Sequence, residues 1–393
     1  MYIEDLARTA GTQIRRRGLP ALAGLVLVLA TGCAEPSTAV SPTPSRSSAG
    51  SGSNPSAGSP SASVPTVSVS TPNTPTSTST RSSKAERCSG AGTAKVGVFR
   101  GTAPKEVDAY ERWLGCRVEY VLDYSSRDTW DEIANPAYLT DAWEGQPRRL
   151  VISVAMLPEK VPDVTIAKGA SGRYDAYFRR LAALLVSSGH QDAIVRIGWE
   201  FNISTSPWFT RDPQAFVQYW RRIVAVMSRV QDNRFKFDWN PHVGVRRVDA
   251  ILYYPGDDVV DLVGVDVYDV NVNGSFYPYP PACDQRCREA AQSAAWNESI
   301  LGGPRGLLFW RDFARAHDKP LSIPEWGIWL REDGLGGGDN PAFVRRMHAF
   351  IVDPANRVAY QIYFEYDLAG SKHRLMTTFR QTGRIFRHLL RDS

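Results

Sequence analysis

The chain has 393 residues and a formal net charge of only +5, and its basic residues are spread along the sequence instead of gathered in blocks. This weak, dispersed charge offers no basic patch, so nucleic-acid binding is not expected. Aromatic residues make up 11% of the chain, and the region after residue 87, of about 300 residues, is long enough to fold around one large core.

The first 33 residues are typical of an export signal. Arg15, Arg16 and Arg17 precede an apolar run over residues 19–30 that is too short to span a bilayer comfortably. The run ends in Leu-Ala-Thr-Gly-Cys at 29–33, which resembles the bacterial lipobox, where the cysteine is lipidated. We therefore expect residues 1–33 to be a lipoprotein signal peptide and Cys33 to anchor an exported protein to a membrane at the bacterial cell surface. Ordinary secretion is the alternative.

Residues 34–87 consist mostly of Ser, Thr, Pro, Gly and Ala. Such a segment cannot bury enough apolar surface to offset the entropy of ordering it, so we expect a disordered linker. Residues 88–393 are then expected to form one folded domain.

The domain contains four cysteines, Cys88, Cys116, Cys283 and Cys287, which allow three disulfide pairings. Proximity in the sequence favours Cys88 with Cys116 and Cys283 with Cys287, and disulfides suit an exported protein. A metal site is the alternative for the Cys283 pair, but no histidine or further cysteine lies near it in the sequence. Nothing resembles a phosphate-binding loop or a zinc motif, so no metal or cofactor is expected.

Short apolar runs alternate with amphipathic helical patterns throughout the domain. The predicted strands are Lys95–Phe99, Val118–Asp123, Arg149–Val154, Ile194–Glu200, Phe235–Asn240, Leu262–Tyr268, Leu321–Glu325 and Val358–Phe364. Helix starts are marked by Asp212-Pro213 and Asn340-Pro341, and Gly189 follows the end of another helical stripe. Eight strands separated by helices predict an α/β fold, a single closed (β/α)8 TIM barrel.

Two predicted strands end in a glutamate next to a tryptophan. The first runs Ile-Val-Arg-Ile-Gly-Trp-Glu-Phe-Asn over residues 194–202, and the second runs Pro-Leu-Ser-Ile-Pro-Glu-Trp-Gly over residues 320–327. In a TIM barrel the carboxyl ends of the strands form the active-site mouth, so Glu200 and Glu325 are expected to meet there. Two carboxyl groups flanking one bond are what glycoside hydrolysis requires.

Other polar and aromatic residues fall at the same strand ends. The candidate substrate-binding residues are Arg196, Trp199, Asn202, Trp208, Trp239, Asn240, Asp266 and Trp326. Arg196 has two interpretations, a cation that keeps Glu325 ionised or the partner of Asp238 or Asp266 in a buried ion pair, and Asp266 can equally be structural. His242 and Asp269 are further candidate contacts, and Trp329 can contact sugar or pack. Glu365, at the end of the last strand, is the rival carboxylate.

The domain resembles glycoside hydrolase family 26, within the clan of (β/α)8 retaining glycosidases. The resemblance begins at Val-Gly-Val-Phe-Arg-Gly (96–101) with Trp-Leu-Gly (113–115). It continues through residues 196–202 with Trp208-Phe209, through Trp239-Asn240-Pro241 and residues 263–268, to Pro-Glu-Trp-Gly (324–327). It implies that Glu200 is the general acid/base, Glu325 the nucleophile and Tyr268 a hydrogen-bond donor to that nucleophile. It also implies that Trp208 and Trp326 are sugar-stacking platforms.

One departure from the family pattern affects specificity. Mannanases of the family usually have His directly before the acid/base and Gly after the following Asn, whereas this chain has Trp199 and Ile203. The best single prediction is a retaining, endo-acting β-1,4-mannanase, with mixed-linkage β-glucan or xylan as the other substrates.

A different class of function also fits the sequence. A lipoprotein that binds carbohydrate without turnover would share the export signal, linker and aromatic residues, but it would not need both glutamates. A solute-binding lipoprotein is disfavoured because the strand count fits one barrel. We expect a monomer whose partners are a polysaccharide and the membrane, and the loop Asn271–Cys287 is a candidate cover for the cleft.

Overall fold

The computed structural model describes residues 86–391, and these residues confirm the predicted (β/α)8 barrel. All pairings in the barrel sheet are parallel, and β10 pairs with both β1 and β8, which closes the sheet. β6 and β7 together occupy one position between β5 and β8. The barrel strands are β1 (Lys95–Phe99), β2 (Tyr120–Tyr124), β3 (Arg149–Val154), β4 (Ile194–Ile197), β5 (Lys236–Trp239), β6 (Leu262–Gly264), β7 (Val267–Tyr268), β8 (Leu321–Gly327) and β10 (Val358–Phe364).

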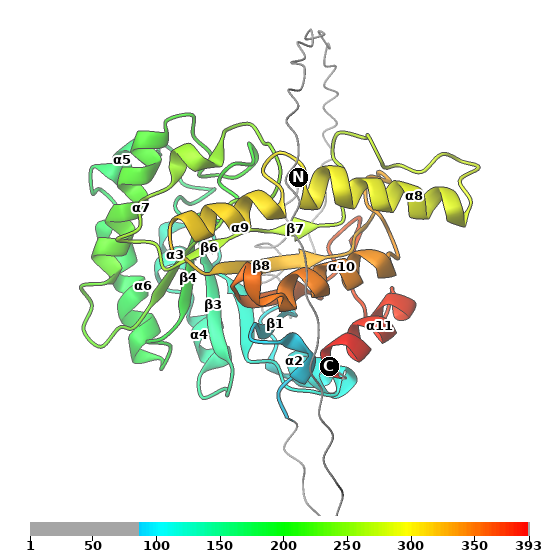
Figure 1. Ribbon diagram of the computed structural model, residues 1–393. Helices are drawn as coiled ribbons and strands as arrows, with labels where there is room; N and C mark the ends of the chain where they lie inside the picture. Colours follow the sequence, from blue (N-terminus) through cyan, green and yellow to red (C-terminus); the bar gives the residue numbers. More distant parts are fainter. Residues whose placement is uncertain (1–85, 392–393) are drawn as a thin grey trace, which may run out of the picture. The chain divides into compact units, whose positions relative to one another are not determined.

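Helices cover the outside of the barrel (Figure 1). They are α2 (Pro104–Leu114), α3 (Trp130–Ala134), α4 (Ala137–Trp143), α5 (Ile166–Ala170), α6 (Asp175–Ser187), α7 (Pro213–Met227), α8 (Gln285–Ala295), α9 (Leu307–Ala316), α10 (Pro341–Val352) and α11 (Arg380–Arg391). Shorter pieces are the helical turns η1 (Ser89–Ala91), η2 (Ala250–Tyr253), η3 (Trp296–Leu301) and η4 (Pro354–Asn356), and the strands β9 (Leu330–Arg331) and β11 (Ser371–Lys372).

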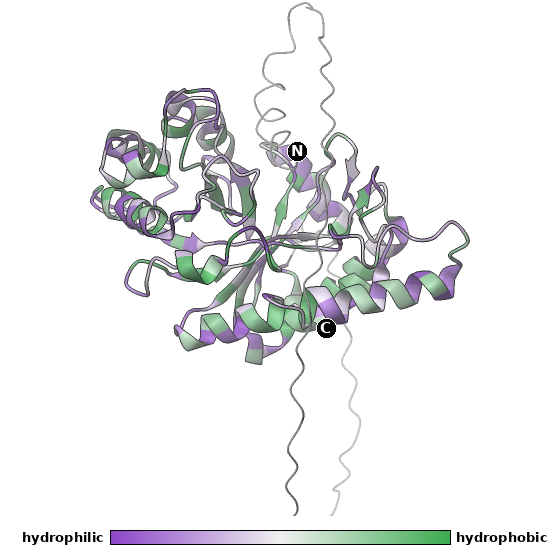
Figure 2. Ribbon diagram, turned by 90° about the horizontal axis from the view of Figure 1, so that it is seen from above, coloured by the Kyte–Doolittle hydropathy of each residue, from purple (hydrophilic) through white to green (hydrophobic). Residues whose placement is uncertain are grey.

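The helix signals in the sequence are confirmed at atomic detail. The side chain of Asp212 accepts a hydrogen bond from the backbone of Ala215, and Asn340 accepts one from Phe343, so both residues are N-caps. Gly189 follows α6 with a left-handed backbone at φ +81°. Figure 2 shows hydrophobic and hydrophilic residues side by side on the helices, as expected for helices that pack one face on a barrel.

Five of the eight strands differ from their predicted bounds, and two of the differences, in the fourth and sixth strands, lie where the site residues are. β4 ends at Ile197 instead of Glu200, because the chain turns at Gly198. The sixth strand is interrupted between β6 and β7, where Asp266 forms an isolated bridge with His242. The regular strand therefore ends before Glu200, whereas Glu325 lies within β8.

The two disulfides have the pairing that sequence proximity favours. Cys88 bonds Cys116, which ties the entry segment to the end of α2, and Cys283 bonds Cys287 at the start of α8. The predicted signal peptide, Cys33 and residues 34–85 of the predicted linker lie outside the described residues. The last two residues of that linker are described, and Arg117 N donates to Glu86 O at 2.9 Å. Among residues 86–391, no helix has the length and hydrophobicity needed to cross a membrane.

Candidate active site

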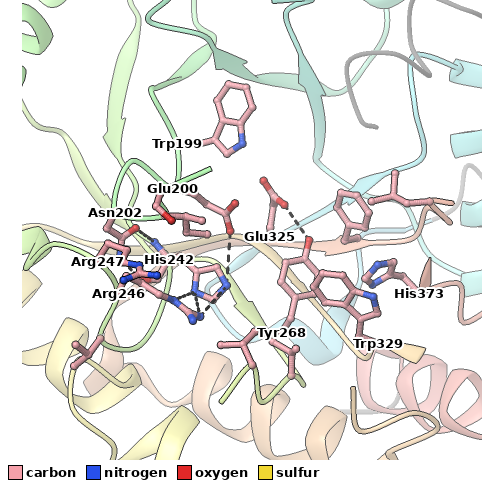
Figure 3. A pocket seen from close by; sticks show the side chains of 17 residues that line it. Trp199, Glu200, Asn202, His242, Arg246, Arg247, Tyr268, Glu325, Trp329 and His373 are labelled. Atoms are coloured by element: carbon pink, nitrogen blue, oxygen red, sulfur yellow. Dashed lines mark hydrogen bonds and ion pairs between the residues drawn. The ribbon is translucent and has the colours of Figure 1, made fainter. Parts of the chain in front are cut away.

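A cavity of about 370 Å³ opens at the carboxyl ends of the barrel strands. Glu200, which follows β4, and Glu325, in β8, both line this cavity, and their carboxyl groups face each other in Figure 3. Trp199, Asn202, His242 and Tyr268 line it as well. The strand ends named from the sequence therefore do converge on one site.

Glu200 is presented by a tight turn. Gly198 and Glu200 both have left-handed backbones, at φ +59° and +50°. A Cβ atom on Gly198 would lie 2.4 Å from the sulfur of Met156, so this position requires glycine. The backbone N–H of Glu200 donates to Asn240 O at 2.8 Å, and Ser206 Oγ donates to Glu200 O at 2.8 Å. A non-glycine residue in this conformation is uncommon and is held only where the surroundings fix it.

The carboxyl group of Glu200 lies beside a histidine that comes from a different strand. His242 Nε2 is 3.7 Å from Glu200 Oε1. His242 Nδ1 lies 2.7 Å from Val243 O, which can only accept, and 2.6 Å from Arg246 Nη2, which can only donate, so these contacts do not select one tautomer. Burial, with the Arg246 charge as a second cause, holds the pKa of His242 well below its usual range. The ring is therefore neutral, and its Nε2 faces Glu200.

Burial raises the pKa of Glu200 to about 8, and the charge of Glu325 adds to the shift. Arg196 and Arg246 oppose it as the smaller causes. Only 7% of Glu200 is exposed, and His242 is neutral, so no strong counter-charge touches this carboxyl. Glu200 is thus protonated at neutral pH, which is the state that a general acid needs.

Glu325 has the opposite surroundings, because two donors hold its carboxylate. Arg196 Nη2 donates to Oε1 at 2.9 Å, and the Tyr268 hydroxyl donates to Oε2 at 2.9 Å. Two hydrogen bonds of this kind fix the orientation of the carboxyl group. A fixed carboxyl group suits a nucleophile, and the predicted contact of Tyr268 with Glu325 is present.

Arg196 lies below the cavity floor and is fully buried. It also donates to Asp266 at 2.8 Å, to Ser153 at 2.8 Å and, through Nε, to Asn240 at 2.7 Å. Arg196 thus pairs with both Glu325 and Asp266. Arg196, Asn240 and Asp266 do not line the cavity, so their predicted contact with substrate is wrong for this conformation. They support Glu325 from beneath.

Three of the four predicted tryptophans are packed away from the cavity. Trp208 is fully buried and donates to Trp199 O at 2.9 Å, and Trp239 donates to Tyr253 O at 3.1 Å. Trp326 donates to Gln361 and packs against Phe386 of α11. Side chains alternate along a strand, so the residue next to an inward Glu325 must face the helices. The stacking roles of Trp208 and Trp326 are therefore wrong here, while Trp199 lines the cavity.

Fixed hydrogen-bond partners hold both Asn202 and Glu365, the rival carboxylate. Asn202 lines the cavity and exchanges two 2.9 Å bonds with the backbone of His242. Glu365 lies outside the cavity, where it accepts from the backbones of Leu375 at 2.7 Å and Met376 at 3.0 Å. Glu365 therefore does not compete with Glu200 for the place opposite Glu325.

Asp269 fixes the loop after β7 instead of facing the cavity. It accepts from the Tyr277 hydroxyl at 2.9 Å and from Asn340 at 2.8 Å. The Tyr279 hydroxyl adds a bond to Gly337 O at 2.8 Å. The loop that contains residues 271–287 is thereby joined to the segment before α10, and Val272 from it lines the cavity.

Several cavity residues, among them His373, Arg246 and Arg247, were missed by the sequence reasoning. His373 and Trp329, which was a candidate sugar contact, form one wall, with their ring centroids 4.6 Å apart, and Arg246 and Arg247 lie on the Glu200 side (Figure 3). The two arginines lie six and seven residues after Asn240, in the loop that follows this predicted strand end, so the loop sequence could have indicated them. Nothing in the sequence pairs His373 with Trp329.

Comparisons with known proteins agree with this geometry. The family description "Glycosyl hydrolase family 26" matches residues 198–279, a segment that contains both Glu200 and Tyr268. No curated protein matches the sequence.

Solved structures share the fold. A modular endo-beta-1,4-mannanase from Cellulomonas fimi is 18% identical with a TM-score of 0.51, over 75% of this chain and 71% of its own. GH26C from Muricauda sp. MAR_2010_75 is 14% identical with a TM-score of 0.51, over 77% of this chain and 87% of its own. At such identities the likeness concerns the fold alone. With the family match and the paired carboxyl groups, it follows that this chain is a glycoside hydrolase, and its resemblance to family 26 is confirmed.

Proposed function

We propose that this protein is a retaining, endo-acting β-glycosidase that hydrolyses β-1,4-mannan. The observation that carries the proposal is the difference between two facing carboxyl groups in one cavity. Glu325 is held by Arg196 and Tyr268, whereas burial raises the pKa of Glu200 to about 8. One ionised and one protonated carboxyl group are what the first step of a retaining mechanism needs.

In that first step, Glu325 attacks the anomeric carbon while Glu200 gives its proton to the leaving oxygen. The glycosidic bond breaks, and an ester bond between Glu325 and the sugar forms. The hydroxyl of Tyr268 and the guanidinium of Arg196 keep the Glu325 oxygens aligned.

The second step uses the electrostatic link between the two glutamates. The charge of Glu325 is one cause of the raised pKa of Glu200, and this charge disappears when the ester forms. The pKa of Glu200 must then fall, so the carboxylate that has lost its proton is suited to act as a base. It takes a proton from the water that attacks the anomeric carbon, and Glu325 leaves as a carboxylate.

Two observations support a polymer as substrate. A second cavity of about 400 Å³ shares His242, Val245 and Tyr268 with the first, so the two adjoin. The fold is also that of the Cellulomonas fimi endo-beta-1,4-mannanase. Trp199 replaces the histidine usual before the acid/base, but His242 supplies an imidazole to Glu200 from the loop after β5. Mannan is thus the first polymer to test.

The proposal places the enzyme on the outside of a bacterial cell, anchored as a monomer through lipid on Cys33. The lipobox-like sequence and two disulfides support export. Cys33→Ala should release the protein from the membrane fraction into the medium, whereas an unchanged distribution would contradict the anchor.

The deciding experiment measures reducing-sugar release by purified residues 86–393 from mannan, glucomannan, mixed-linkage glucan and xylan. Proton NMR of the first product gives its anomeric configuration. Release of a β-configured product from mannan, absent in Glu200→Ala and Glu325→Ala, is the expected result. An α-configured first product would overturn the retaining mechanism, and binding without release from any polymer would favour the carbohydrate-binding alternative.

A further inference from the structure

The loop after β5 places two arginines at the cavity without carboxylate partners. Arg246 and Arg247 both line the cavity that holds the two glutamates, and Arg246 also lines the second cavity. Arg246 donates to His242, and within residues 86–391 neither arginine forms an ion pair. Two cations at the mouth of a sugar-binding cavity require an explanation beyond the neutral polymer.

The fold holds this loop in place on both sides of the arginines. Before them, Val243 N donates to Asp266 O at 3.1 Å and Gly244 N donates to Arg305 O at 2.8 Å. After them, Asp249 forms an ion pair with Arg305, with Nε donating at 3.0 Å. The carboxylate of Asp249 is thereby occupied, so the loop's own acidic residue does not neutralise Arg246 or Arg247.

The catalytic glutamates do not neutralise these cations either. Glu325 is paired with Arg196 at 2.9 Å. Burial raises the pKa of Glu200 to about 8, so this group is uncharged in the resting enzyme at neutral pH. Burial also lowers the pKa of Arg246, which indicates a cation that loses hydration without gaining an anion. Glu298 of η3 lines the second cavity, but it forms no ion pair with either arginine in the described part of the chain.

The side of the cavity on which the arginines lie identifies the sugar they would contact. Figure 3 shows Arg246 and Arg247 with His242 on the Glu200 side, opposite Trp329 and His373. The general acid protonates the leaving oxygen, so the departing sugar lies on the side of Glu200. Guanidinium groups match carboxylates with paired hydrogen bonds.

We propose that Arg246 and Arg247 bind an anionic substituent, a carboxylate, on the departing sugar, so that the preferred polymer is an acidic one. This inference rests on the proposed glycosidase function and narrows its substrate class. Cleavage would leave the acidic sugar at the non-reducing end of the released product.

The test compares polymers that share a backbone. Mannan and mixed-linkage glucan are each used unmodified, with part of their C6 hydroxymethyl groups oxidised to carboxylates, and with sulfate esters. Cleavage rates and borohydride-reduced products are measured, and binding is measured by affinity electrophoresis with Glu325→Ala. The sulfated arm separates carboxylate recognition from general attraction to anions.

The variants separate the arginines from their neighbours. Arg247→Gln touches neither His242 nor Glu200 in any described contact, while Arg246→Gln removes the bond to His242 and Arg246→Lys keeps the charge. Arg345→Gln is the matched control, because Arg345 is exposed on α10 and lines neither cavity.

We expect the oxidised polymer to be favoured about tenfold or more in kcat/KM, the range of a charge-assisted hydrogen bond. Arg247→Gln should reduce this preference, Arg345→Gln should not, and acidic sugars should stand at the non-reducing ends of products. Cleavage and binding that are equal for neutral and oxidised polymers would overturn the inference and leave the glycosidase intact. Binding preference that depends on Arg247, without cleavage of any polymer, would instead support the inference and contradict the proposed function.

Discussion

Glu200 and Glu325 are the same residue type at the ends of two strands of one barrel, yet the fold gives them different chemistry. Glu325 lies within strand β8 and accepts hydrogen bonds from two donors, Arg196 and Tyr268. Glu200 stands past the end of β4 on a left-handed residue, and its neighbour His242 is neutral. The difference teaches that partners, and not residue type, decide which carboxyl group is charged.

The largest expected effect comes from removing either glutamate. Glu325→Ala and Glu200→Ala should each lower kcat/KM by about 10³-fold or more. Azide distinguishes the two roles, because it can replace either missing carboxylate. Addition of azide should give an α-glycosyl azide with Glu325→Ala and a β-glycosyl azide with Glu200→Ala, identified by NMR. The reverse assignment of products would mean that the roles are exchanged.

The next effect concerns the support of Glu325. Arg196→Met leaves Asp266 and Glu325 buried without their shared counter-charge, so the free energy of unfolding should fall by about 3–5 kcal/mol. Chemical denaturation measures this loss. Arg222→Met is the control, because its ion pair with Asp175 is partly exposed and should contribute only about 0–1 kcal/mol. Equal losses in the two variants would contradict the central role of Arg196.

The protonation of Glu200 predicts the alkaline limit of activity. Its pKa is raised to about 8, and only the protonated form can give a proton, so kcat/KM should fall as the pH rises above about 8. A 2,4-dinitrophenyl glycoside needs no protonation of its leaving group, so this limb should vanish with that substrate. If kcat/KM still falls above about pH 8 with this substrate, a group other than Glu200 is responsible for the fall.

Two variants, Trp329→Phe and Trp326→Phe, test which tryptophan contacts sugar. Trp329→Phe should raise KM by roughly threefold to tenfold, because this ring lines the cavity. Trp326→Phe should leave KM unchanged and lower stability by about 1–3 kcal/mol, because the ring packs between β8 and α11. Steady-state kinetics and thermal unfolding measured on both variants check this opposition.

The smallest effect on activity is expected at Glu365. Burial raises its pKa to about 7, so the folded state holds this proton more tightly than the unfolded state does. The associated stability is complete below about pH 4.5 and is lost as the pH rises toward 7, by at most about 1.4 kcal/mol per pH unit. Glu365→Gln should flatten this dependence in denaturation experiments, with kcat within about twofold of the wild type. A large loss of kcat would reopen its candidacy as a catalytic group.

The sequence by itself determined the barrel, because apolar strand runs and amphipathic helices are local patterns with fixed periods. It also placed Glu200, Glu325 and Tyr268 at one mouth, because parallel strands bring their carboxyl ends together. It erred on Trp326 and Trp239, although strand alternation alone would have turned both rings outward.

Only the tertiary structure decided what depends on long-range contacts. The turn at Gly198 moves Glu200 out of the strand, His242 reaches Glu200 from another strand, and Arg196 is covered so that it holds Glu325 instead of sugar. The protonation of each carboxyl group follows from burial and from neighbours distant in the chain, which no local sequence pattern records.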